Sequence, residues 1–294
     1  MNTLKTDETD DSRVLRPLVF FPAGASSAKT PVADFSRPDF FRPDVSRSDH
    51  RARIIRLRER TLNMLKNDLL LRNPLRLMGP ENRPLVPEGG FGAVVARAGV
   101  GKTALMVQVA FNTLLQQKNV LHVSLDDPVD KVNVWYQEVL SGLAHQYHVR
   151  QIRELWESIQ MHRFIMTFKV EGFSVPKLEE RVTDLTEQEI FNPHMVIIDG
   201  LPFEGEMRAP LEGLKAFSEK HRIHLWFTVT THQDDTPGPD GLPVQLETVS
   251  DLFDAVIQLQ PDGKTTRIRC LKGCLGDTAD DQCLDPATML IQAS

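Results

Sequence analysis

Two kinds of apolar pattern alternate along the middle of the chain. Short runs of consecutive apolar residues are typical of strands buried on both faces of a parallel sheet. Longer stretches with apolar residues three or four positions apart predict helices that cover such a sheet. The runs lie at residues 91–95, 119–125, 164–170, 194–199 and 224–231, and the periodic stretches at residues 104–115, 129–145, 151–160, 174–191 and 209–221. This alternation predicts an α/β fold with a mostly parallel central sheet, flanked by helices and connected by right-handed crossovers.

The pattern changes after residue 231. Residues 234–246 are rich in Asp, Gly and Pro, which predicts a long flexible loop. Residues 254–260 and 265–271 flank the turn sequence Pro-Asp-Gly-Lys and predict a hairpin, and residues 288–292 predict a last short strand. Antiparallel edge strands therefore finish the sheet at its C-terminal end.

The N-terminal part follows neither pattern, so the chain divides into three parts. Residues 1–48 mix Pro, Ser, Asp and Arg with Phe pairs and show no helix or strand period, which predicts a disordered or loosely docked arm. The Phe pairs either anchor a protein partner or fold back on the chain. Residues 49–73 predict an amphipathic helix, and residues 74–294 predict one α/β domain. The polar face of that helix is either solvated or contacts nucleic acid or an acidic partner; its cations are Arg51, Arg53, Arg56, Arg58, Arg60 and Lys66.

A glycine loop joins the first predicted strand of the domain to its first helix. The segment is Ala96, Arg97, Ala98, Gly99, Val100, Gly101, Lys102 and Thr103, followed by Ala104. It matches the phosphate-binding motif G-x-x-x-x-G-K-[ST], with Ala96 in place of the first Gly. In this motif backbone N–H groups surround the phosphates, the Lys contacts the β and γ phosphates, and the hydroxyl ligates Mg²⁺. We therefore predict a nucleotide phosphate site in which Lys102 and Thr103 take these two roles.

Polar residues end three other predicted strands. Asp199 is predicted to hold Mg²⁺ through a water, and its alternative role is to cap a turn. Asp126 and Asp127 end a strand that opens on the same sheet edge as the phosphate loop. One of them is predicted to be the general base toward the attacking water, and the alternative role of Asp127 is to cap the next helix. His232 is a candidate γ-phosphate sensor, or else a structural hydrogen-bonding residue.

Composition narrows the class of protein. The 294-residue chain has a net charge of −6, which argues against a coat of nucleic acid over the whole protein. Cys270, Cys274 and Cys283 lack the spacing of a metal site or a disulfide framework and are interpreted as reduced thiols. No apolar stretch approaches the ~18 residues of a membrane helix, and the first residues lack the apolar region of a secretory signal. We expect a soluble, cytoplasmic protein with no membrane contact.

Three features together resemble the RecA superfamily, over about residues 75–292. They are the phosphate loop, the strand that ends in two acids and Pro128, and the following helix with Trp135 and Tyr136. Within the superfamily the chain resembles the branch of KaiC-type clock ATPases, RadA-type recombinases and DnaB-type helicases. The resemblance implies a RecA-like P-loop fold and a catalytic carboxylate, usually Glu, at the end of the strand where this chain has two Asp residues.

The same resemblance implies that the active site is shared between subunits. The family places a Lys or Arg from a late strand in the ATP site of the neighbouring subunit. Lys272 is the first match to that position and Arg269 the second, in a segment that also holds Arg267. The chain is therefore expected to form a homo-oligomeric ring or filament.

We expect an ATP-binding and ATP-hydrolysing RecA-like protein whose nucleotide state controls assembly or partner binding. One alternative is a DNA-binding motor or a recombination or replication accessory ATPase. The loop at residues 234–246 corresponds to the family's DNA-contacting loop, but it has three Asp and no Lys or Arg, which disfavours phosphate-backbone contact. The other alternative is a non-hydrolysing nucleotide-binding regulatory module, which the exchange of Glu for Asp permits.

Overall fold

The computed structural model describes residues 47–73, 85–232, 235, 238, 240–274 and 282–293. Contacts divide the chain into residues 1–46 and residues 47–294, and all described residues belong to the second unit. Residues 1–46 of the predicted arm therefore lie outside the described residues. Part of the predicted loop at residues 234–246 lies outside them as well.

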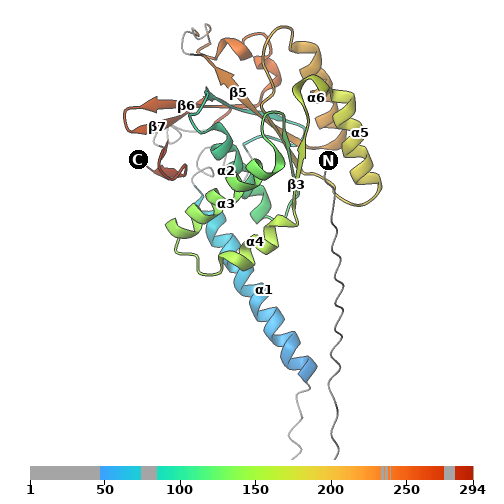
Figure 1. The fold of residues 1–294 in the computed structure, drawn as a ribbon, viewed down its shortest axis with the longest axis vertical. Helices are drawn as coiled ribbons and strands as arrows, with labels where there is room; N and C mark the ends of the chain where they lie inside the picture. The colour runs from blue at the N-terminus through green and yellow to red at the C-terminus, as the bar shows by residue number, and fades with distance from the viewer. Residues whose placement is uncertain are drawn as a thin grey trace, which may run out of the picture. The chain divides into compact units, whose positions relative to one another are not determined.

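Nine strands of the described chain form one sheet (Figure 1). Their order is β3 (Arg163–Thr167), β2 (Val120–Ser124), β4 (Met195–Asp199), β5 (His224–Thr231), β1 (Phe91–Arg97), β6 (Ala255–Asp262), β7 (Thr265–Lys272), β8 (Gln282–Leu284) and β9 (Ile291–Ala293). The strands from β3 to β6 are parallel, and β7, β8 and β9 add antiparallel pairs. The predicted fold class is confirmed, although β8 was not predicted and the last strand begins only at Ile291.

Helices cover both faces of the sheet, and each face has its own apolar core. One face carries α1 (Arg47–Arg72), α2 (Lys102–Leu115), α3 (Val129–Gln146) and α4 (Ile152–Gln160), and the other carries α5 (Val175–Glu187) and α6 (Arg208–His221) (Figure 1). Short 3₁₀ helices lie at Val170–Gly172, Val244–Leu246 and Ser250–Leu252. The predicted strand at residues 164–170 ends at Thr167, and the first of these 3₁₀ helices begins at Val170.

Strand β4 explains why the central strands are continuous apolar runs. Met195 and Ile197 join the core under α2, whereas Val196 and Ile198 join the core under α5 and α6. Successive side chains of a strand point to opposite faces, so a sheet covered on both sides needs apolar residues at every position. The polar residue that ends the run, Asp199, lies at the edge of the sheet where α2 begins.

Helix α1 is confirmed, but its apolar face is covered only toward its C-terminal end. Leu69 is buried in the core beside α2, and Leu62 and Leu65 pack against the same core. Ile55 and Leu57, near the other end, are 55% and 54% exposed. The helix therefore projects from the body of the molecule (Figure 1). None of the helices in the described part of the chain is long and apolar enough to cross a membrane.

The structure corrects the interpretation of the cysteines. Cys270 and Cys274 form a disulfide, and Cys283 is free. Strand β7 ends between the paired residues, and the chain turns at Gly273, which has a φ of 82°. This turn brings the two Cα atoms to 6.0 Å, within the range of a disulfide. The prediction of three reduced thiols is therefore wrong for Cys270 and Cys274.

Candidate nucleotide-binding site

The glycine loop lies between the end of β1 at Arg97 and the start of α2 at Lys102. Gly101, the N-cap residue of α2, has a φ of 109°, a conformation that glycine adopts without steric cost. A Cβ at this position would also lie 2.8 Å from Leu284 Cδ2, so both the backbone and the packing favour Gly. Ala96 is a buried residue of β1, and Ala104 is buried in the first turn of α2. The backbone N–H groups at the start of α2 make this loop a suitable anion site.

Lys102 is folded back over the glycine loop. Its Nζ donates hydrogen bonds of 3.2 Å to the carbonyl oxygens of Ala96 and Arg97. Burial lowers the pKa of the Lys102 ammonium, and the carboxylates of Asp199 and Asp126 oppose that change. The cation is therefore held beside the loop and faces the acidic end of the site.

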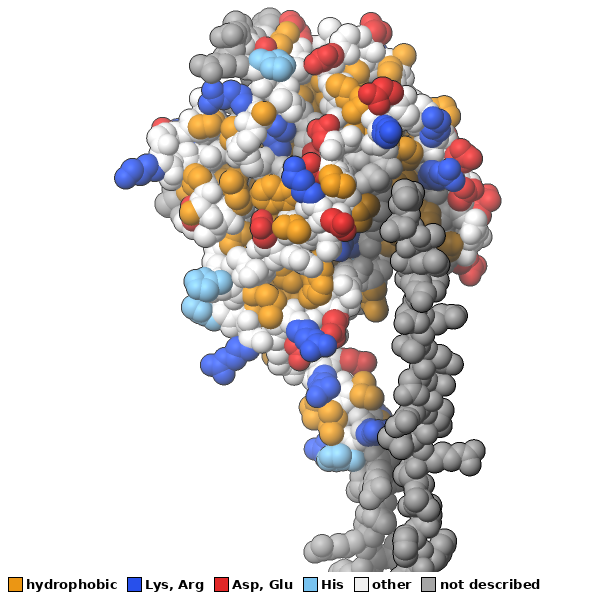
Figure 2. All heavy atoms as spheres, in the orientation of Figure 1, with side chains coloured by type: hydrophobic (Ala, Val, Ile, Leu, Met, Phe, Trp, Pro, Cys, Tyr) orange, Lys and Arg blue, Asp and Glu red, His pale blue; other side chains and the backbone are white. Residues whose placement is uncertain are grey.

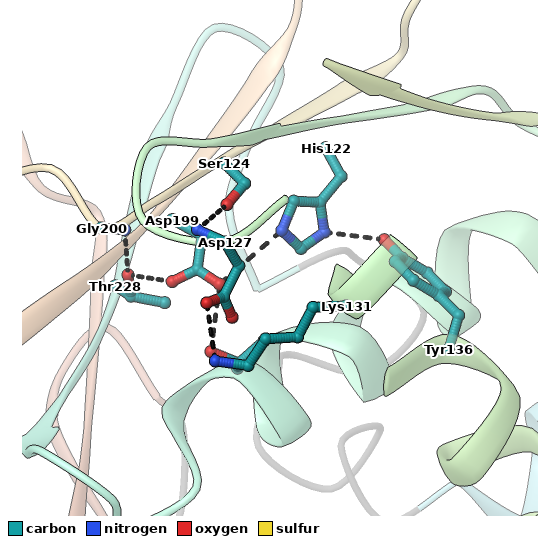
Figure 3. Close-up of polar contacts among 9 residues, drawn as sticks. His122, Ser124, Asp127, Lys131, Tyr136, Asp199, Gly200 and Thr228 are labelled. Carbon is teal, nitrogen blue, oxygen red and sulfur yellow. Dashed lines mark hydrogen bonds and ion pairs between the residues drawn. The ribbon is translucent and has the colours of Figure 1, made fainter. Parts of the chain in front are cut away.

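Asp199, the last residue of β4, is held by two hydroxyl groups. Thr228 Oγ1 donates to Asp199 Oδ1 at 2.6 Å (Figure 3). Thr103 Oγ1 donates to Asp199 Oδ2 at 3.0 Å. Burial by itself would raise the pKa of Asp199, but His122 and the hydrogen bonds from Thr228 and Thr103 outweigh burial and hold this pKa below its ordinary value. The carboxylate is therefore ionised at neutral pH and points at the first turn of α2.

The structure separates the two acids that follow β2. Asp127 pairs with Lys131 one turn along α3 at 2.7 Å, and its backbone N–H donates to Ser124 Oγ at 2.9 Å (Figure 3). Asp127 does not cap α3, because the N-cap residue is Pro128 and no side chain makes a capping hydrogen bond there. Asp127 is therefore engaged by its neighbours in α3 and β2.

Asp126, unlike Asp127, lies against the turn that follows β4. A Cβ on Gly200 would lie 2.5 Å from Asp126 Oδ2, so a side chain at residue 200 would displace the carboxylate from its observed position. Partial desolvation raises the pKa of Asp126, and the negative charges of Asp199 and Asp127 raise it further. Of the two predicted bases, Asp126 is the one that faces Asp199 and Lys102.

The oxygen atoms of Thr103 and Asp199 fit a Mg²⁺ ion. Mg²⁺ takes oxygen ligands and usually combines one or two protein groups with water and phosphate oxygens. Among the residues that the structure describes, no group of three or more His, Cys, Asp or Glu side chains is arranged to hold a metal ion by itself. The donor set therefore suits a metal that arrives with a phosphate ligand.

His232 lies at the same edge of the sheet but in a different environment. It lines a cavity of about 290 Å³ at the ends of β1, β5 and β6, together with Arg97 and Thr231. Its backbone N–H donates to Asp235 Oδ2 at 2.6 Å, and its side chain is exposed. Neither Asp126 nor Asp199 lines this cavity, so the candidate sensor is separated from the two acids.

The three cations of β7 have different surroundings within one chain. Lys272 Nζ donates to the carbonyl oxygen of Ser250 at 2.8 Å. Arg267 pairs with Asp262 at 2.7 Å. Arg269 is exposed on β7. These contacts hold Lys272 and Arg267 to groups outside the glycine loop of their own subunit.

A family model for an AAA domain matches residues 73–232. This span covers more than half of the 294-residue chain and contains the glycine loop, Asp126 and Asp199. The chain belongs to the AAA domain family. It is therefore a nucleotide-binding protein of the P-loop ATPase type. The AAA domain match ends at His232, so the strands from β6 to β9 lie beyond it. No curated protein matches the chain.

Three polar residues at this AAA domain site were missed by sequence reasoning. Ser124 and Thr228 are buried residues with hydroxyl groups. The Ser124 hydroxyl accepts a hydrogen bond from the backbone N–H of Asp127, and the Thr228 hydroxyl donates one to Asp199. His122 lies within β2, and its Nδ1 is 3.1 Å from the hydroxyl oxygen of Tyr136. A signal was present in the sequence, because Ser124, His122 and Thr228 interrupt otherwise apolar strands. A buried polar residue needs a partner, and such an interruption therefore marks a candidate contact.

Proposed function

We propose that this chain binds ATP with Mg²⁺ and hydrolyses it, and that its nucleotide state controls assembly or the binding of a partner. The observation that carries the proposal is the 3.0 Å contact between Thr103 and Asp199, next to Lys102. Phosphoryl transfer depends mainly on positioning and on stabilising charge. A hydroxyl, a buried carboxylate and an ammonium group at one end of a glycine loop supply these requirements for a phosphate chain.

Each residue then has a definite task. Lys102 would turn from the loop carbonyls toward the β and γ phosphates. Thr103 and Asp199 would hold Mg²⁺, which would neutralise charge on the phosphate oxygens. Asp126 accepts the proton of the attacking water. The raised pKa of Asp126 supports this task, because a stronger base accepts a proton more readily near neutral pH. The side chain of Asp is one methylene shorter than the usual Glu, so we expect slow hydrolysis.

In an assembly, a second copy of the chain would supply a positive charge to the phosphate site. Arg269 and Lys272 are the candidates in a second copy of the chain. The ammonium of Lys272 is occupied by the Ser250 carbonyl, whereas the side chain of Arg269 is exposed. This difference supports Arg269 ahead of Lys272, the reverse of the order inferred from the family resemblance.

The test combines molecular mass and turnover. Light scattering with and without ATP and Mg²⁺ measures assembly, and phosphate release is measured in the same samples. We expect a larger species with ATP and Mg²⁺, together with phosphate release. ATP binding without release in the assembled state would instead identify a non-hydrolysing regulatory module. A chain that binds no ATP would contradict the proposal.

A second candidate function, contact with nucleic acid, is supported by α1. Five of its exposed arginines lie between residues 51 and 60, and Figure 2 shows Lys and Arg side chains on the helix that projects below the body. Those arginines are Arg51, Arg53, Arg56, Arg58 and Arg60. A DNA-binding titration at several salt concentrations tests this function, because phosphate contacts lose affinity steeply as salt rises. Binding that does not depend on salt, or that survives replacement of these arginines by Ala, would exclude α1 as the contact.

A further inference from the structure

His122 is a polar residue at a buried strand position, where apolar residues are expected. It lies in the middle of β2, and its relative exposure is 0%. Its neighbours Leu121 and Val123 are both buried core residues. An imidazole buried without hydrogen-bond partners costs free energy that Val or Ile at this position would not cost. The contacts of His122 should therefore explain why a polar residue occupies this position.

The two ring nitrogens of His122 face two different groups (Figure 3). Nδ1 is 3.1 Å from the hydroxyl oxygen of Tyr136, and Nε2 is 3.7 Å from Asp199 Oδ2. The second distance exceeds that of a hydrogen bond, and within the described residues Nε2 has no hydrogen-bond partner. A small movement of either group would close this gap.

The hydroxyl of Tyr136 lies beside Nδ1 of His122 and can donate a hydrogen bond to it. Its ring is fully buried and is fixed by the Arg163 guanidinium 4.4 Å from its centroid and by an edge contact with Phe111. Burial raises the pKa of the Tyr136 hydroxyl, so this group stays neutral and keeps a proton that it can donate. When the hydroxyl donates to Nδ1, the single proton of neutral imidazole must be on Nε2. That N–H points toward Asp199.

We propose that His122 is a positioning residue that holds the Asp199 carboxylate in the orientation required for Mg²⁺. Thr228 fixes Oδ1, and Thr103 and the imidazole approach Oδ2 from different elements. Residues that orient a metal-binding carboxylate restrict its rotation and so reduce the free-energy cost of metal binding. The inference rests on the proposed function, since it takes Asp199 as the carboxylate on the metal side.

The first experiment uses the metal-free chain. Nitrogen-15 NMR of the histidine rings identifies the tautomer of His122, with its resonance assigned by loss in His122→Phe. We expect the Nε2–H tautomer in the wild-type chain and a mixture of tautomers in Tyr136→Phe, which keeps the aromatic packing. An Nδ1–H tautomer in the wild-type chain would overturn the inference whether or not the protein binds nucleotide.

The second experiment measures metal affinity, with Mn²⁺ as the probe in the presence of ADP and electron paramagnetic resonance as the readout. We expect His122→Phe to weaken Mn²⁺ binding about 10- to 100-fold and to leave metal-free ADP affinity unchanged. His122→Gln, which retains an N–H donor, should recover part of the loss. Equal Mn²⁺ affinity in the wild-type chain and His122→Phe would overturn the inference. A wild-type chain that binds neither ADP nor Mn²⁺ would instead overturn the proposed function on which it rests.

If His122→Phe fails to fold, Tyr136→Phe tests the same inference. Removal of the hydroxyl alone should weaken Mn²⁺ binding several-fold, because Nε2 then carries the proton in only part of the molecules. Unchanged Mn²⁺ affinity together with an unchanged tautomer in this variant would overturn the inference.

Discussion

Thr103 and Asp199 lie 96 residues apart in the chain, and their side chains meet at 3.0 Å. Thr103 is in the first turn of α2, and Asp199 is the last residue of β4. The parallel sheet creates this contact, because the carboxyl ends of its strands and the start of α2 share one edge. The same edge holds Asp126, whose position next to Gly200 depends on the turn after β4.

Asp126 and Asp127 are expected to differ sharply when each is replaced. Asp126→Asn should lower ATP hydrolysis roughly 100- to 10,000-fold, the range for loss of a general base. Asp127→Asn is the matched control, because it removes the pair with Lys131, which contributes little, and only the smaller of the two carboxylate charges that raise the pKa of Asp126. Phosphate release under saturating ATP measures the difference. A larger loss in Asp127→Asn than in Asp126→Asn would reverse the assignment.

Gly200 should be intolerant of a side chain for two separable reasons. Gly200→Ala places a Cβ at a φ of 87° and 2.5 Å from Asp126 Oδ2. Gly205 also has a positive φ, 69°, but nothing lies within 4 Å of a Cβ there. Both substitutions should lower the free energy of unfolding by about 1 kcal/mol through backbone strain.

Only Gly200→Ala should also reduce phosphate release, because only this change displaces Asp126. Urea unfolding and turnover, measured on both variants, separate strain from displacement. Equal turnover in Gly200→Ala and Gly205→Ala would show that the contact with Asp126 has no role in hydrolysis.

His194 should make the fold sensitive to acid. Its Nε2 lies 3.1 Å from His224 Nε2, and His224 Nδ1 donates to the Pro87 carbonyl, so His224 Nε2 is left as the acceptor. Burial, with smaller effects from Lys118 and His224, lowers the pKa of His194 to about 4. Below about pH 6.5 the unfolded chain gains a proton that the folded chain does not bind until about pH 4. The free energy of unfolding should therefore fall as the pH falls through this window.

The measurement is urea unfolding at several pH values between about 7 and 4. His194→Asn should show a shallower decline than the wild-type chain, and His232→Asn, which changes an exposed side chain, serves as the control. A decline in His194→Asn as steep as that of the wild-type chain would contradict this account.

The disulfide between Cys270 and Cys274 should stabilise the fold modestly. It closes a loop of five residues, for which restriction of the unfolded chain corresponds to about 2 kcal/mol. Cys270→Ser should lower the free energy of unfolding by about this amount without reductant, and dithiothreitol should have the same effect on the wild-type chain. Cys283→Ser changes the free cysteine and is the control. A stability of Cys270→Ser equal to that of Cys283→Ser would contradict the prediction.

Much of the fold follows from local pattern. The apolar run of β4 predicts a strand covered on both faces, and its two alternating sets of residues do lie in two different cores. The glycine loop between β1 and α2 is equally visible, because its spacing and the residues that flank it are all local. These features need no knowledge of which strands become neighbours.

The contacts that complete the site depend on strand register, which the pattern does not encode. Thr228 reaches Asp199 because β5 pairs with β4, and His122 reaches it because β2 pairs with β4 on the other side. The roles of Asp126 and Asp127 are also not separable in the sequence, since either residue can end the strand or begin the turn. In the structure, Lys131, one helical turn beyond Asp127, binds the Asp127 carboxylate and so distinguishes the two residues.

Lys102 is the residue on which nucleotide binding by the glycine loop should depend most directly. Isothermal titration with ATP and Mg²⁺, followed by phosphate release, should be performed on the wild-type chain, on Lys102→Ala and on Lys220→Ala, which removes an exposed lysine paired with Glu179. We expect Lys102→Ala to weaken ATP affinity roughly 10- to 150-fold, corresponding to the loss of charge-assisted contacts of about 1.5–3 kcal/mol, and to abolish phosphate release. Lys220→Ala should match the wild-type chain. Unchanged ATP affinity and turnover in Lys102→Ala would contradict the assignment of the glycine loop as the nucleotide site.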